Sequence, residues 1–132
     1  MKKYLLYLVF LLLITAGILF YIRSGTQNFS SSIIDKNEIL ASDTVITEND
    51  QGYSTSEITI KKGARVVWLN ETSSYIWPAS NLHPTHDIYP EFDPKEPIEQ
   101  GKAWFFVFKK VGEWGFHDHL KPTRRGIVRV IE

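Results

Sequence analysis

From about Thr44 to its last residue, the chain alternates apolar and polar residues with a period close to two. No window in this region repeats apolar residues at helical spacing, so the sequence predicts an all-β domain. The alternation is clear at residues 56–60, and after a Lys-Lys-Gly turn we expect residues 65–69 to run back as a half-buried strand. With 132 residues, the chain is long enough for one globular domain and too short for a two-domain enzyme.

Three later segments extend the predicted sheet: residues 104–108, 113–119 and 126–131. The first of these is aromatic or β-branched at every position, which favours a strand over a helix. Between residues 70 and 101 lies a long, proline-rich connection that also carries several aromatic residues. Loops of this length are functional or disordered, and the aromatic residues favour an ordered loop anchored on the sandwich.

An apolar run at residues 4–22 follows two N-terminal lysines. At about 1.5 Å per residue its helix would nearly match the ~30 Å hydrocarbon core, and it exceeds the apolar region of a secretory signal. We therefore expect residues 1–23 to form one N-terminal transmembrane helix, with a cleaved signal as the alternative. The lysines then stay in the cytoplasm, and the domain lies outside the cell membrane, in the periplasm or at the cell exterior. We expect a flexible tether at 24–43 and the β domain at 44–132.

Charge and cysteine content exclude several functions. Lys plus Arg total 15 and Asp plus Glu total 15, so the basic excess of a nucleic-acid-binding protein is absent and we expect no nucleic-acid partner. The chain contains no cysteine. This absence excludes disulfide bonds, thiolate catalysis, iron–sulfur clusters and every metal centre that needs a cysteine sulfur.

The histidines fall in two short motifs, His-Pro-Thr-His at 83–86 and His-Asp-His at 117–119. In an extended segment, residues two apart point to the same side, so the second motif presents two imidazoles to one face. The proline in the first motif restricts the conformations that must be frozen to bring both of its rings to one ion. We therefore predict a site for one metal ion. The predicted ligands are His83, His86, His117 and His119.

Two alternatives remain open for these residues. Asp118 could be a fifth ligand or a partner that orients an imidazole. Without a metal, the histidines would instead form hydrogen bonds at strand ends. Because imidazole suits copper and zinc, and because thiolate is absent and the one methionine is Met1, the ligand chemistry favours Cu(II). Copper is our first choice of metal and zinc our second.

The succession of these elements resembles the cupredoxins over about residues 55–132. The likeness is carried by the strand pair at 58–70, the His-bearing loop, the aromatic strand at 104–108 and the Gly-Glu-Trp-Gly-Phe segment at 112–116. It implies a Greek-key β-sandwich of the plastocyanin and multicopper-oxidase type. The metal site would then lie at one end, between the loops that follow the Trp68 and Trp114 strands.

The two histidine motifs are similar to the His-Pro-x-His-x-His and His-Cys-His motifs of the multicopper-oxidase branch. Here Ile88 replaces the third loop histidine, and Asp118 replaces the cysteine of the type 1 copper site. A blue copper centre is therefore excluded. The resemblance also implies that His83 lies beside Asp118, apart from the other three histidines, whereas the simpler interpretation of the two motifs places all four histidines on one ion.

Together these features predict a membrane-anchored, exported cupredoxin-like protein with a non-blue copper site. Its expected role is copper binding, copper delivery or electron transfer, with a redox or copper-delivery protein as partner. We therefore expect a metal-binding or electron-transfer protein more than an enzyme. One alternative is a type-2-like copper oxidoreductase that acts on superoxide or another small oxidant. Another is a metal-free β-sandwich that presents its proline-rich loop to a partner protein.

Overall fold

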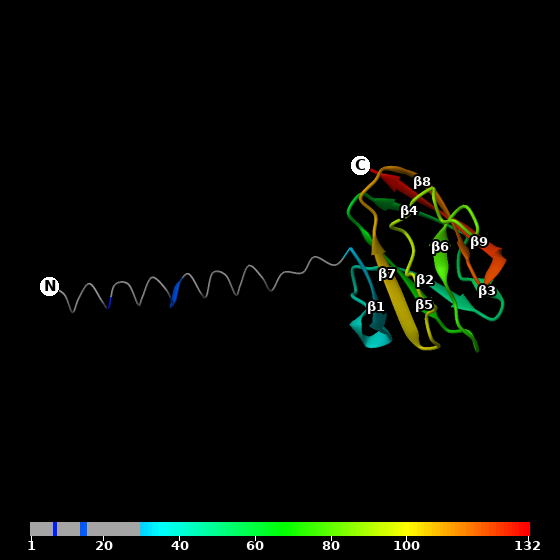
Figure 1. Cartoon of the computed structure of the whole chain (residues 1–132), viewed down its shortest axis with the longest axis horizontal. Coiled ribbons are helices and arrows are strands. Elements are labelled where there is room, and N and C mark those ends of the chain that lie inside the picture. Colours follow the sequence, from blue (N-terminus) through cyan, green and yellow to red (C-terminus); the bar gives the residue numbers. More distant parts are fainter. Residues whose placement is uncertain (1–6, 8–13, 16–29) are drawn as a thin grey trace.

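The computed structural model describes residues 7, 14–15 and 30–132, and the last range forms a two-layer β-sandwich (Figure 1). The all-β prediction is confirmed. One sheet has the strand order β1-β7-β5-β2-β3, and the other has the order β4-β9-β8-β6. The elements are β1 (Ser31–Asp35), the 3-10 helix η1 (Lys36–Glu38), β2 (Thr44–Asn49), β3 (Gly52–Tyr53), β4 (Glu57–Lys61), β5 (Arg65–Asn70), β6 (Pro78–Ser80), β7 (Lys102–Val107), β8 (Gly112–Asp118) and β9 (Lys121–Ile131).

The core between the sheets is largely aromatic. Trp68 on β5 is fully buried, and its ring lies 5.4 Å from that of Trp104 on β7 and 5.5 Å from that of Phe116 on β8. The intervening residues of β5 and β7, such as Val67 and Phe105, form a second buried cluster on the outer face of the same sheet. Both faces of these two strands are covered, which explains their unbroken apolar sequence.

Part of the predicted tether, residues 24–43, belongs to the sandwich. β1 pairs antiparallel with β7, and Ile34 and Ile39 pack on the outer cluster formed by β5 and β7. The domain therefore begins before Thr44, because these apolar side chains bury surface that β7 would otherwise expose to water.

The predicted membrane segment, residues 1–23, lies outside the described residues except for residues 7 and 14–15. Within the described part of the chain, no helix combines the length and the apolar character that a membrane crossing requires.

The proline-rich connection is ordered and is held by aromatic side chains, as its sequence suggests. Phe92 is fully buried, and its ring stacks on Trp104 with a centroid distance of 5.7 Å. Tyr89 is buried beside Phe106, whereas Tyr75 is exposed. The connection also contains the short strand β6, which pairs with β8 at the edge of the four-stranded sheet, a position that tolerates its proline.

A polar cluster lies inside the sandwich where β2, β3, β8 and β9 meet. Glu48 and Asp118 are fully buried carboxyl groups, and the Arg124 guanidinium donates to Glu48 Oε1 at 2.6 Å. Tyr53 lies opposite Glu48 on β3. Glu48 Oε2, Asp118 Oδ2 and the Tyr53 hydroxyl have no hydrogen-bond partner among the described residues. Among the described residues, Arg124 is therefore the one cation paired with Glu48, and the nearby Asp118 adds a second buried carboxyl group.

The buried carboxyl group of Glu48 predicts that the unfolding free energy depends on pH. Burial raises the pKa of Glu48 from 4.5 to about 7, although the hydrogen bond from Arg124 opposes the rise. Between these values the folded protein holds a proton that the unfolded chain has released, so Glu48 makes the unfolding free energy fall as the pH rises from 4.5 to about 7.

We expect the Glu48→Gln variant to gain stability relative to the wild type across this window, with the gain largest at the upper end. Urea unfolding of both proteins at several pH values measures this difference, and other titrating groups cancel in it. A difference that stays constant or shrinks with rising pH would contradict the assignment.

Candidate metal centre

The four histidines converge at one end of the sandwich because β6 pairs with β8. This pairing sets Ala79 opposite His117 and Pro78 opposite Asp118, so the loop that follows β6 lies against the end of β8. The peptide N–H of His119 donates to the Trp77 carbonyl at 2.7 Å and ties the two segments together. The motifs at 83–86 and 117–119 therefore meet although more than thirty residues separate them.

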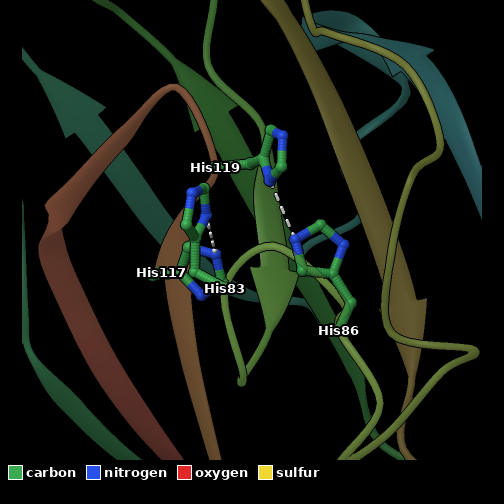
Figure 2. A group of neighbouring side chains, drawn as sticks. All are labelled: His83, His86, His117 and His119. Carbon is green, nitrogen blue, oxygen red and sulfur yellow. Dashed lines mark hydrogen bonds between the residues drawn. The ribbon is translucent and has the colours of Figure 1, made fainter.

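The imidazole rings face one another around a common point (Figure 2). His83 Nδ1 lies 3.3 Å from His117 Nε2, and His86 Nε2 lies 2.9 Å from His119 Nδ1. One nitrogen from each residue lies within 4.8 Å of the other three. The structure thus brings together all four side chains that the sequence predicts as ligands, and their binding of a metal ion stays a prediction. The group includes His83, whose ring contacts His117 and joins the other three histidines.

The cluster is buried on one side and open on the other. His86 and His117 are 4% and 1% exposed, His119 is half-buried, and His83 is exposed. The Trp77 ring packs beside His119 with a centroid distance of 4.9 Å. Two imidazoles are therefore fixed inside the protein, and His83 forms the side that solvent reaches.

Two residues outside the histidine motifs hold the buried rings in orientation. The Asp93 carboxylate accepts a hydrogen bond from His86 Nδ1 at 2.7 Å, and the Asn81 side-chain oxygen accepts one from His117 Nδ1 at 3.1 Å. Because both rings donate from Nδ1, their Nε2 atoms face the other two histidines at the centre of the cluster. Hydrogen bonds of this kind are typical of metal-ligating histidines.

Asp93 is itself fixed from several sides. Its other contacts come from the Trp77 indole nitrogen at 2.8 Å and from the amide and ammonium groups of Lys95 at 2.9 and 2.8 Å. Burial alone would raise the pKa of Asp93, but hydrogen bonds from Lys95, His86 and Trp77 outweigh it and hold the pKa well below the ordinary value. The carboxylate therefore stays charged and keeps accepting from His86.

The histidines on β8 and just after it are neutral at physiological pH. Burial, followed by the nearby His86 and His83, lowers the pKa of His117 from 6.5 to about 4. The same causes lower the pKa of His119. A neutral imidazole keeps the lone pair that a metal ion needs, so these rings are ready to coordinate without first losing a proton.

Asp118 does not belong to the group of converging ligand atoms. Its Oδ1 accepts from the backbone amides of Trp77 at 2.9 Å and Leu120 at 3.0 Å, and its side chain is buried next to the Glu48 cluster. Asp118 therefore shapes the loop that carries His119. The sequence leaves open that Asp118 orients an imidazole; in the structure, Asp93 has that role. No motif or regular spacing in the sequence marks Asp93 or Asn81.

The four imidazole nitrogens suit a metal ion that prefers imidazole ligands. At a metal–nitrogen distance of about 2.0 Å, neighbouring nitrogens of a four-coordinate site lie roughly 3.3 Å apart. The two closest pairs, at 3.3 and 2.9 Å, are near this value. The most distant nitrogens, up to 4.8 Å apart, need to approach by about 1.5 Å to reach this separation.

Asp93→Asn is expected to weaken copper binding by about 10- to 100-fold, because the amide no longer offers His86 a charged acceptor. Competition titration with a copper chelator measures the loss. Asp87→Asn is the matched control: Asp87 is exposed in the same loop, and its replacement makes the same change in charge. Equal affinities for the two variants would show that Asp93 does not support the site.

A two-sheet sandwich with histidines at one end defines a class: the chain has a cupredoxin-like fold, and it lacks the type 1 copper cysteine. No protein-family model and no curated protein matches the sequence. Solved structures do match. A reduced copper(I) form of an amicyanin variant has a TM-score of 0.66 and 19% sequence identity, covering 77% of this chain and 99% of the amicyanin.

Two further structures are similar. Amicyanin from Paracoccus versutus has a TM-score of 0.64 and 22% identity, covering 76% of this chain and 92% of its own. The purple cupredoxin from Nitrosopumilus maritimus has a TM-score of 0.59 and 24% identity, covering 67% of this chain and all of its own. At these identities the likeness establishes the fold.

Proposed function

We propose that the protein binds one copper ion through His83, His86, His117 and His119 and serves in copper binding, copper delivery or electron transfer. The observation that carries the proposal is the convergence of four imidazole nitrogens within 4.8 Å of one another in a chain without cysteine. A neutral, nitrogen-rich donor set suits Cu(II), and copper ranks above zinc in the affinity order of divalent ions. The copper(I) form of the similar amicyanin supports copper as the metal.

Titration of Cu(II) into the metal-free full-length protein tests this function. We expect one tightly bound equivalent per chain, with Zn(II) bound more weakly. Electron paramagnetic resonance of the copper complex should show couplings to several nitrogen nuclei. If neither metal binds, the proposed function fails, and the metal-free interaction module becomes the better description.

The copper complex is expected to lack the intense visible absorption of a blue copper protein. That absorption comes from a copper–thiolate bond, and this chain has no cysteine to form one. A visible spectrum of the Cu(II) protein checks the expectation. An intense blue band would refute a site built from imidazoles alone.

A second candidate is a copper oxidoreductase that acts on superoxide or another small oxidant. The exposure of His83 favours it, because a solvent-accessible ligand is the one a small molecule can displace to reach the metal. Superoxide-dependent turnover by the copper-loaded protein, absent from the metal-free protein, would support this activity.

We include membrane attachment in the proposal, with residues 1–23 as the anchor and the β domain outside the cell membrane. The length of the apolar run at 4–22 and the two lysines before it support this orientation. Membrane fractionation followed by protease treatment of intact cells tests it. Any outer membrane is permeabilised first, and cleavage of the domain only after the cell membrane itself is lysed would place it inside and contradict the proposal.

A further inference from the structure

A hollow lies next to the histidine cluster, on the outer face of the four-stranded sheet. Its volume of about 480 Å³ falls within the range of small-molecule sites. On β8, Gly115 and His117 point to this outer face, because Phe116 between them is buried in the core. The floor of the hollow includes Gly115 and the neighbouring Ile127 of β9.

Asn81 separates the hollow from the histidine cluster. Its side-chain oxygen accepts from His117, and its amide nitrogen lies over Gly115, where any Cβ would collide with it. Because Gly115 has no side chain, the Asn81 amide can lie against it and form part of the wall of the hollow. That amide nitrogen donates to no residue in the described part of the chain, and its hydrogens can be offered to a ligand.

Arg125 contributes a cation to the same hollow. Among residues 30–132, the other three arginines each pair with a carboxylate, whereas Arg125 has no such partner. Its Nε donates to the Pro122 carbonyl at 2.7 Å, which fixes the direction of the guanidinium. The two remaining guanidinium nitrogens form a planar pair of donors that matches a carboxylate.

The rest of the lining restricts the kind of anion. Glu57 and Glu113 stand at the hollow, each paired with Arg129 at 3.3 and 3.1 Å. Their negative charge disfavours multiply charged anions such as phosphate. The floor, formed by Gly115, Gly126 and Ile127, suits a small apolar body.

We propose that this hollow binds a small organic monocarboxylate, with its carboxylate held by the Arg125 guanidinium and the Asn81 amide and its apolar body on the glycine-lined floor. Binding at this place requires no metal, so the proposal stands apart from copper binding. The ligand would nevertheless contact the residue that orients His117, one of the predicted copper ligands.

Titration of butyrate into the metal-free, ¹⁵N-labelled full-length protein in detergent tests the proposal by nuclear magnetic resonance. We expect saturable shifts of the backbone amides of Gly115, Gly126 and Ile127. Arg125→Gln should weaken binding at least about tenfold, since a hydrogen-bonded charge is removed. Lys61→Gln is the matched control and should retain binding, because it removes the same charge at an exposed position of the same sheet outside the hollow.

Three further measurements decide the chemistry. Butyramide, the uncharged analogue, should bind at least about tenfold more weakly than butyrate, and so should inorganic phosphate. Gly115→Ala should also abolish the shifts, because the added methyl group displaces the Asn81 amide. The proposal is overturned if butyramide or phosphate binds as well as butyrate, or if Arg125→Gln leaves the affinity unchanged.

Discussion

Replacing His117 and His119 together with alanine is expected to weaken copper binding by at least about a thousandfold. Four ligands that share roughly 10–16 kcal/mol of binding free energy each contribute about 3 kcal/mol, and about 1.4 kcal/mol corresponds to a tenfold change. The two histidines belong to the same segment, on either side of Asp118, so their removal leaves only the loop histidines. Chelator competition measures the affinity, and circular dichroism checks the fold.

The burial of His117 calls for two controls. Its side chain is 1% exposed, so alanine there leaves a cavity and costs some stability besides the ligand. His83→Ala removes an exposed ligand, and we expect it to weaken copper binding by about a hundredfold at unchanged stability. Thr85→Ala, also exposed in the loop of His83, should bind like the wild type. Undiminished affinity in the His117/His119 double variant would place the copper elsewhere.

The four histidines of the candidate site could be predicted because their information is local. An H-x-H pattern on an extended segment already presents two rings to one side, and the only other histidines of the chain lie close together in one loop. That the two segments meet follows from the pairing of β6 with β8. β6 is three residues long and begins with proline, so its sequence carries no strand pattern, and only the resemblance to the cupredoxins indicates where the loop lies.

The residues that orient the histidines could not be predicted in the same way. Asp93 lies seven residues beyond His86, in a loop where Phe92 is buried in the core beside it. Its approach to His86 depends on that burial and on the Trp77 hydrogen bond, both of which are tertiary interactions. Asp118, adjacent to two ligands in sequence, points into the sandwich because side chains alternate along β8.

β1 could not be predicted for a related reason. The segment 31–35 has only two apolar residues among polar ones, and its composition is that of a linker. The strand forms because β7 offers it five paired positions and because Ile34 covers the outer cluster on the sheet. Its structure therefore depends on a partner about seventy residues away, whereas the periodic strand β4 and the unbroken apolar strand β5 can be recognised from their own residues.

Replacing Arg124 with leucine is expected to lower the unfolding free energy by about 3–5 kcal/mol at about pH 8. Among the described residues, Arg124 is the only cation that contacts the buried Glu48, and it also donates to the carbonyls of Asn49 and Asp50 at 3.0 and 2.7 Å. Without it, Glu48 stays inside the sandwich with no cation in contact among the described residues, and the charge of the nearby Asp118 further disfavours its ionised form. Urea unfolding measures the loss, which should be smaller at pH 5 than at about pH 8, because Glu48, with a pKa raised to about 7, is charged only at the higher pH.

Two further variants separate the buried charge from the arginine side chain itself. Arg129→Leu removes a half-exposed arginine whose ion pairs with Glu57 and Glu113 lie at the surface, so it should cost less than about 1 kcal/mol. Adding Glu48→Gln to Arg124→Leu should restore more stability at about pH 8 than Glu48→Gln adds to the wild type, because Arg124 no longer offsets the buried carboxylate. If the double variant is no more stable than Arg124→Leu, the cost comes from lost packing and backbone contacts, and the buried carboxylate of Glu48 is not its cause.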